Sequence, residues 1–215
     1  MKTLIAIPSC HAEKFVQLRQ ACRDTWVGKW GHLVDIKFFL GLPLFPSSLD
    51  EISLDAPDTY KLLPLKVRAM FIWILAHGYD RILKCDDDTY VHVPRLLACG
   101  KDAFDYVGRL DNPNHYTWWM HGGAGYWLSR RMMEYLVNLP LSAWQSDWRE
   151  DRTVGLNARR ACQLNGWTLA FDNKRLWDSH YPQYPSSPKP DNQTITAHKC
   201  DVARHHAIHA PFASI

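Results

Sequence analysis

Three consecutive aspartates, Asp86-Asp87-Asp88, directly follow a short and mostly apolar run that has the character of a buried strand. Packing does not explain them, because adjacent like charges repel one another and aspartate is a poor strand residue. Two explanations stay open from these residues alone. One is an acidic loop that caps the next helix or forms part of a calcium site. The other is a carboxylate cluster at the carboxyl end of a strand, holding a divalent cation for a phosphate-bearing ligand.

The bulk composition favours one sizeable domain, or at most two small ones. The chain has 215 residues, of which 47% are apolar and 22% charged, enough to bury a full core. A net charge of +3 is too small to argue for nucleic-acid binding on electrostatics alone. The six cysteines include no C-x-x-C pair, which argues against a structural zinc site and leaves disulfides undecided.

Strand-like and helix-like segments alternate as far as the aspartates. Strands are expected at residues 3–7, 33–40, 105–110 and 168–171, with a further strand leading to Asp86. Helices are expected at residues 15–26, 67–75, 94–98, 129–137 and 150–164. Residues 118–128 predict a strand, a tight glycine loop and another strand, and few regular signals follow Asp172. The alternation predicts an α/β fold with a mostly parallel, twisted sheet flanked by helices.

Two charged clusters can complete a phosphate-binding or catalytic site. Arg19, Arg23 and Lys66 carry the charge to neutralise a diphosphate, although each alone is more simply explained by a solvated helix face. Glu150 and Asp151 open a predicted helix, where acidic side chains commonly cap the first amides. The alternative is that one of them is a general base for an acceptor hydroxyl.

A histidine-rich tail and a glycine run are ambiguous in the same way. An imidazole beside a carboxylate can complete the coordination of a manganese-like ion, although a lone histidine is usually structural. The candidates are His198, His205, His206 and His209. The run Gly122-Gly123-Ala124-Gly125 lacks the spacing of a dinucleotide fold or a P-loop. It predicts either a β-bulge or a place where a ligand ring lies against bare backbone.

These clusters follow one another in a characteristic order. In chain order they are Arg19-x-x-x-Arg23-x-Thr25-Trp26, Asp58-x-Tyr60 with Lys66, Lys84-x-Asp86-Asp87-Asp88-x-Tyr90-Val91, Gly122-Gly123-Ala124-Gly125-Tyr126-x-Leu128-Ser129 and Glu150-Asp151-x-x-x-Gly155. The ordered set resembles the Fringe-like β-1,3-glycosyltransferases, a family that includes galactosyl- and N-acetylglucosaminyltransferases. Ile195-Thr196-Ala197-His198-Lys199 resembles the family's closing histidine element, so the resemblance spans residues 4 to about 200.

The resemblance implies a single GT-A (Rossmann-like) domain that binds a UDP-sugar with Mn²⁺ or another divalent cation. It implies that Asp88 and His198 ligate the metal together with Asp86, which also faces the donor. Asp151 would be the catalytic base, with Glu150 beside it. The donor-binding set would comprise Arg19, Arg23, Asp58, Lys66, Asp86, Asp87, Gly122, Gly123 and Ala124. Residues 1–110 would form the nucleotide-sugar half, and residues 111–215 the acceptor and catalytic-base half.

By this resemblance the expected function is inverting transfer of a sugar to an acceptor hydroxyl, forming a β-1,3-type linkage on a glycan or glycoconjugate. Two alternatives stay open: a phage or viral enzyme acting on hydroxymethylated DNA bases, and a non-catalytic metal-dependent nucleotide-sugar or carbohydrate-binding protein. Aromatic residues near the expected sugar site could stack on sugar rings: Trp118, Trp119, Tyr126, Trp127, Trp144 and Trp148.

The expected location is the cytoplasm of a bacterial, phage or viral system. The family's animal members are membrane-anchored, whereas the first strand-like run of this chain begins at Thr3 with no signal peptide or anchor before it. No apolar run approaches the roughly 20 residues that span a bilayer.

The sequence also departs from the family next to the expected catalytic base. Arg152 stands where the family usually has an apolar residue.

Overall fold

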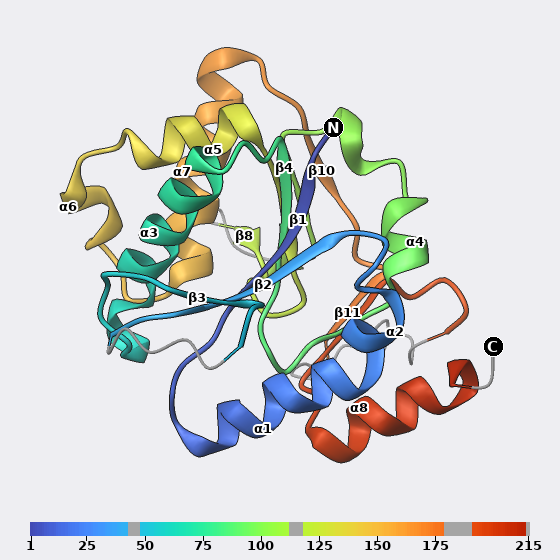
Figure 1. Cartoon of the computed structure of the whole chain (residues 1–215). Coiled ribbons are helices and arrows are strands. Elements are labelled where there is room, and N and C mark those ends of the chain that lie inside the picture. Colours follow the sequence, from blue (N-terminus) through green and yellow to red (C-terminus); the bar gives the residue numbers. More distant parts are fainter. Residues whose placement is uncertain (43–47, 112–117, 179–190, 214–215) are drawn as a thin grey trace.

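The computed structural model describes residues 1–42, 48–111, 118–178 and 191–213 (Figure 1). The helices are α1 (Glu13–Cys22), α2 (Gly28–Trp30), α3 (Leu63–Ala76), α4 (Val93–Leu97), α5 (Arg130–Val137), α6 (Leu141–Trp144), α7 (Glu150–Asn165) and α8 (Val202–His209), and a π-helical turn at Arg23–Val27 joins α1 to α2. The strands are β1 (Thr3–Pro8), β2 (Asp35–Leu40), β3 (Glu51–Ser53), β4 (Arg81–Lys84), β5 (Tyr90–Val91), β6 (Tyr106–Gly108), β7 (Leu110–Asp111), β8 (Trp119–Met120), β9 (Tyr126–Ser129), β10 (Leu169–Phe171), β11 (Leu176–Asp178) and β12 (Thr196–His198).

A seven-stranded sheet in the order β10-β6-β9-β4-β1-β2-β3 forms the centre of the molecule. β1 pairs in parallel with β2 and β4, β2 with β3, and β6 with β10. β9 runs antiparallel to both of its neighbours, β4 and β6. Strands from both halves of the chain share this sheet, so the chain forms a single α/β domain with a mostly parallel sheet, as predicted.

The sheet is buried on both faces, which explains why its strands are almost continuously apolar. Leu4 and Ala6 of β1 belong to one core cluster together with residues of α3, α5 and α7. Ile5 and Ile7, which point the other way because side chains alternate along a strand, pack with Trp26 and the second cluster. Figure 1 shows α3, α5 and α7 grouped together, while α1 and α8 lie side by side away from them.

Several helices begin or end at residues whose backbone chemistry favours a helix boundary. Pro64 lies in the first turn of α3, and Gly78, just beyond its end, has φ of +73°, a conformation that glycine adopts without strain. The Ser129 hydroxyl caps α5 by accepting a hydrogen bond from the amide of Met132. Gly166 ends α7 in the left-handed conformation.

The C-terminal region differs from the expectation of few regular elements. β11, β12 and α8 all lie after Asp172. β12 is only three residues long and forms because it pairs with β11 on one side and β5 on the other. Such a short strand depends on tertiary pairing rather than on a local pattern, so periodicity does not reveal it.

Gly155 allows α7 to pack closely on β8. A Cβ at this position would lie 2.4 Å from Trp119 Cβ and 2.9 Å from the Tyr106 hydroxyl. We expect Gly155→Ala to lower the free energy of unfolding by about 1–3 kcal/mol, since overpacking outweighs the gain in helix propensity of about 1 kcal/mol. Urea denaturation measures this change. Arg160→Ala, at an exposed position of the same helix, is the control and should change stability by less than about 0.5 kcal/mol.

All six cysteines are free thiols, and four of them are buried. Across the described parts of the chain, no helix combines the length and the apolar character that crossing a bilayer requires.

Candidate metal and sugar-transfer site

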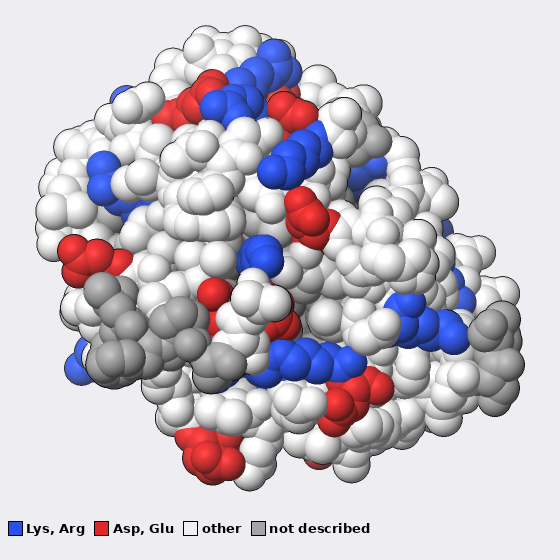
Figure 2. Space-filling model, in the orientation of Figure 1, with Lys and Arg blue, Asp and Glu red and all other residues white. Residues whose placement is uncertain are grey.

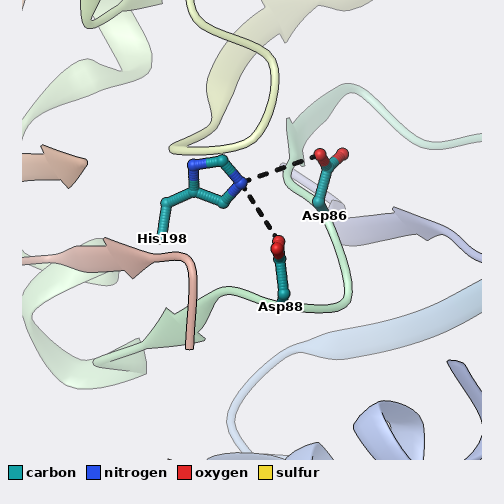
Figure 3. A group of neighbouring side chains, drawn as sticks. All are labelled: Asp86, Asp88 and His198. Atoms are coloured by element: carbon teal, nitrogen blue, oxygen red, sulfur yellow. Dashed lines mark ion pairs between the residues drawn. The ribbon is translucent and has the colours of Figure 1, made fainter. Parts of the chain in front are cut away.

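Asp86, Asp88 and His198 converge at the carboxyl end of β4 (Figure 3). One ligand atom from each lies within 4.8 Å of the other two. His198 Nε2 is 3.1 Å from Asp88 Oδ1 and 3.9 Å from Asp86 Oδ2. The buried Asp88 Oδ1 accepts no hydrogen bond from the described residues. Two carboxylates and an imidazole form a donor set that suits Mn²⁺ or a similar divalent ion, so these residues fit the expected metal.

Strand pairing brings His198 to the aspartates across more than a hundred residues of sequence. β12 pairs with β5, which begins two residues after Asp88, and the amide of Cys200 donates to the Asp88 carbonyl at 2.8 Å. Among the described residues, His205, His206 and His209 lie outside the group that could hold a metal. His205 is fully buried on α8, and this burial lowers its pKa to about 4. Of the four candidate histidines, His198 is therefore the one beside the aspartates.

The glycine run leaves room for the His198 ring. A Cβ on Gly123 would lie 2.2 Å from His198 Nε2, so the ring occupies the space that any other side chain would need. The Thr89 hydroxyl donates to the Gly123 carbonyl at 2.8 Å, and the Thr196 hydroxyl to the Ala124 carbonyl at 2.6 Å. These bonds fix the loop between the aspartates and β12. The bare backbone of Gly123 therefore accommodates the imidazole of His198, a side chain of the protein itself.

A buried lysine links Asp86 to the start of α7. Lys84 Nζ lies 2.8 Å from Asp86 Oδ1 and 2.9 Å from Glu150 Oε2, and Tyr126 donates its hydroxyl to the other oxygen of Glu150. Burial acts to lower the pKa of Lys84, but the two carboxylates raise it above its ordinary value. Burial acts to raise the pKa of Asp86, but Lys84 and then His198 lower it to about 2. Asp86 is therefore ionised at neutral pH, as metal ligation requires.

Asp151 lies beside the same loop and is partly exposed. Its Oδ2 accepts a hydrogen bond from the Gly122 amide at 3.2 Å, and its Cβ would be 2.9 Å from a Cβ on Gly122. Glu150, in contrast, is 4% exposed and is bonded to Lys84 and Tyr126. Burial raises the pKa of Glu150, although Lys84 opposes this effect. Of the two predicted catalytic carboxylates, Asp151 is thus the more accessible to a substrate.

Asp87 is 4% exposed and, among the described residues, lies outside the group of Asp86, Asp88 and His198. Its Oδ2 accepts a hydrogen bond from the Ser9 hydroxyl at 2.5 Å, and Ser9 in turn accepts one from Arg19 at 2.8 Å. Burial raises the pKa of Asp87 to about 7; the Ser9 hydrogen bond opposes this, whereas the Asp86 and Asp88 carboxylates add to it. The predicted contact of Asp87 with the donor sugar stays a prediction.

Arg19 and Arg23 lie behind the site and are paired with acidic residues. Arg19 is 2% exposed and donates to Glu51 at 3.0 Å. Arg23 makes a bidentate pair with Asp50, both distances being 2.9 Å, and also donates to Glu51. Asp50 and Glu51 come after the second strand in the chain, and no sequence pattern indicates that they pair with the arginines. The predicted role of the arginines at the diphosphate stays a prediction.

A cavity of about 640 Å³ opens next to the aspartates and has the size of a small-ligand site. Its walls include Ser9, Cys10, Asp58, Lys66, Asp86, Asp87, Asp88 and also Tyr60 and Lys199. Lys66 Nζ lies 2.6 Å from Asp58 Oδ1 and 2.6 Å from the Ser9 carbonyl. The predicted donor-binding residues Asp58, Lys66, Asp86 and Asp87 therefore share one cavity.

Lys199 is a site residue that the sequence did not single out. Its Nζ lies 3.3 Å from Asp88 Oδ2, and its backbone has φ of +61°, the one positive value at a non-glycine residue in the described parts of the chain. Such a conformation in a residue with a Cβ is sparsely populated and commonly found at functional sites. In the sequence, Lys199 could have been found from its position directly after His198.

The fold is that of known glycosyltransferases. No protein-family model matches the chain. A crystal structure of a glycosyltransferase involved in the glycosylation of the major capsid of PBCV-1 superposes with a TM-score of 0.56 at 11% identity, covering 97% of this chain and 99% of that one. The galactosyltransferase LgtC, solved with donor and acceptor sugar analogues, superposes with a TM-score of 0.54 at 10% identity, covering 100% and 97%. The chain adopts the GT-A fold of these neighbours. At such low identities the likeness concerns the fold.

Proposed function

We propose that this protein is an inverting, metal-dependent glycosyltransferase that moves a sugar from a UDP-sugar to an acceptor hydroxyl, forming a β-1,3-type linkage on a glycan. The observation that carries this proposal is the convergence of Asp86, Asp88 and His198 beside the 640 Å³ cavity. Asp151 adjoins this group, and its carboxylate accepts a hydrogen bond from the Gly122 amide of the glycine loop. Inverting, metal-dependent transfer from a nucleotide-sugar needs each of these parts: a cation site, a donor cavity and a base. The GT-A fold of the two glycosyltransferases supports the same reaction class.

Asp86, Asp88 and His198 would hold the divalent ion, which when bound supplies positive charge against the departing diphosphate. Lys199, 3.3 Å from Asp88, and Lys66, in the wall of the same cavity, would add positive charge against that diphosphate. Lys84 holds Asp86 by a buried ion pair, so the carboxylate stays ionised and oriented. A preformed arrangement of this kind stabilises the leaving group without reorganisation during the reaction.

Asp151 would act as the general base. An acceptor hydroxyl must lose its proton as its oxygen attacks the anomeric carbon, and Asp151 is the partly exposed carboxylate next to the metal group. The bond from the acceptor oxygen to the anomeric carbon forms as the bond to the diphosphate breaks. The proton goes to Asp151, and a single in-line displacement converts an α-linked donor into a β-linked product. Glu150 would contribute by holding Lys84 in place.

A screen of UDP-sugars tests the proposed function. Purified protein with Mn²⁺ should release UDP from one or more of UDP-galactose, UDP-glucose, UDP-N-acetylglucosamine and UDP-N-acetylgalactosamine, and EDTA should stop the release. An acceptor screen with the active donor would then define the product. UDP binding without UDP release from any of these donors would favour a non-catalytic binding protein and contradict the proposal.

Gly123→Ala should weaken Mn²⁺ binding, because the added Cβ would overlap the His198 ring. We expect the affinity to fall by about 10- to 100-fold, the range typical of disturbing groups that orient a metal ligand. Electron paramagnetic resonance of free Mn²⁺ in the presence of UDP measures this change. Gly100→Ala is the control for an alanine placed away from the site: a Cβ there meets nothing within 4 Å, and the strain at its φ of +70° lies outside the metal group. Equal Mn²⁺ affinity in the two variants would contradict the assignment of His198.

A further inference from the structure

Two exposed aromatic rings lie together at the rim of the site. Tyr60, in the 3₁₀ turn Tyr60–Leu62, is 72% exposed, and Trp148, in the loop before α7, is 51% exposed. Their ring centroids are 5.4 Å apart, and the ring planes are inclined at 55°. Tyrosine and tryptophan combine a large apolar face with a polar tip, which is why they are enriched at interaction surfaces.

Burial separates Trp148 from the other aromatic candidates for sugar stacking. Trp119, Tyr126, Trp127 and Trp144 are at most 7% exposed and belong to the core. Trp118 is partly buried and packs edge-on against Phe171. Of the six aromatic residues near the expected sugar site, Trp148 thus presents the largest accessible ring. Tyr60 joins it from a different part of the chain.

The aromatic pair adjoins the reacting groups. Tyr60 lines the same cavity as Asp86 and Asp88. Partial burial, followed by the negative charges of Asp151 and Asp86, raises the pKa of the Tyr60 phenol. The guanidinium carbon of Arg149 lies 5.8 Å from the indole centroid of Trp148, a cation–π contact.

We propose that Tyr60 and Trp148 form the acceptor platform, on which a neutral hexose unit of a glycan lies with its C–H face against the rings and a hydroxyl toward Asp151. This inference rests on the proposed function and adds the chemical class of the acceptor. A sugar ring has an apolar face and a polar edge, so an aromatic corner can hold the face while the edge reaches the base.

The same geometry disfavours a nucleic-acid acceptor. Rings inclined at 55° with centroids 5.4 Å apart leave no parallel slot between them for a flat base. A basic patch or stripe is the usual footprint of nucleic-acid binding. On the face shown in Figure 2, basic and acidic side chains are instead interspersed.

Fluorine NMR of protein labelled with 5-fluorotryptophan tests the platform without a donor. The chain has ten tryptophans, and Trp148→Phe identifies the resonance of Trp148. The probes are methyl β-galactoside, methyl β-glucoside, methyl N-acetyl-β-glucosaminide and, separately, a thymidine oligonucleotide. We expect at least one glycoside to shift the Trp148 resonance in a saturable way and the oligonucleotide to leave it in place.

Variants of Tyr60 make the test specific. Tyr60→Ala should weaken the glycoside affinity by about tenfold, the effect of one good aromatic contact, whereas Tyr60→Phe keeps the ring and should retain it. Leu164→Ala, at the far end of α7, removes an exposed apolar side chain elsewhere and should change nothing. A resonance that shifts with none of the glycosides, that shifts equally in Tyr60→Ala, or that shifts with the oligonucleotide alone would overturn the inference. Because no donor is present, failure here is distinguishable from failure to release UDP.

Discussion

Asp151→Asn is expected to slow sugar transfer by about 10²- to 10⁴-fold while donor binding stays nearly unchanged. The amide keeps the size and the hydrogen bond to the Gly122 amide, at 3.2 Å in the wild-type structure, but it cannot take the acceptor proton. The measurements are kcat with saturating donor and acceptor, and calorimetric binding of UDP with Mn²⁺. A lower kcat with unchanged UDP binding would show that Asp151 acts in the transfer step and not in donor binding.

Asp201→Asn is the matched control for this substitution. Asp201 also begins a helix, and its carboxylate accepts a hydrogen bond from the Arg204 amide at 2.8 Å, a role that asparagine performs equally well. We expect wild-type transfer from this variant. Wild-type transfer by Asp151→Asn as well would contradict the assignment of Asp151 as the base.

Asp88→Ala is expected to abolish Mn²⁺-dependent UDP binding. The substitution removes the carboxylate that lies 3.1 Å from His198 Nε2, so the affinity should fall by more than about 100-fold, since outer contacts of a metal site alone cost about 10- to 100-fold. Isothermal titration of UDP in Mn²⁺ and in EDTA measures the metal-dependent part. His198→Ala should cause the same loss, because both side chains belong to one coordination group.

His206→Ala provides the control for the histidine. His206 is exposed on α8 and lies outside the metal group of the described residues. Its replacement should leave UDP binding and its Mn²⁺ dependence at wild-type values. Unchanged UDP binding in Asp88→Ala would contradict the proposed metal site, whatever the result for the histidines.

The core of the fold was predictable because its signals are local. The strands at residues 3–7 and before Asp86 are apolar runs, and Pro64, Ser129 and Gly166 mark helix ends by their own backbone chemistry. Strand alternation with helices then indicated a mostly parallel sheet, and the structure confirms it. Within the seven-stranded sheet, β9 runs antiparallel to its neighbours, and this was not predicted, since the direction of a strand depends on the path of the chain between elements.

The convergence of Asp86, Asp88 and His198 was predictable only through the order of motifs. Asp86 and Asp88 are conspicuous in the sequence, but His198 is one of four histidines near the C-terminus and reaches them through a three-residue strand. No local pattern distinguishes it from His205, which is buried at 0% exposure without a hydrogen-bond partner for either ring nitrogen among the described residues. Long-range pairing between β12 and β5 makes the difference.

Charge and aromaticity alone were poor guides to side-chain direction. Glu150 and Arg19 look exposed in sequence but are at most 4% exposed, because each is paired with an opposite charge in the interior. Trp144 and Trp148 are four residues apart, yet the first is in the core and the second on the surface. Which of two such residues faces a substrate is decided by packing between elements.

The position of the cation is the most direct test of the proposed site. Crystals grown with UDP and Mn²⁺, measured above the manganese absorption edge, would give an anomalous difference map. We predict one strong peak per chain between the side chains of Asp86, Asp88 and His198, next to the UDP diphosphate in the cavity lined by Lys66 and Lys199. UDP bound in that cavity with no anomalous peak at these three residues, or a peak at another place, would contradict it.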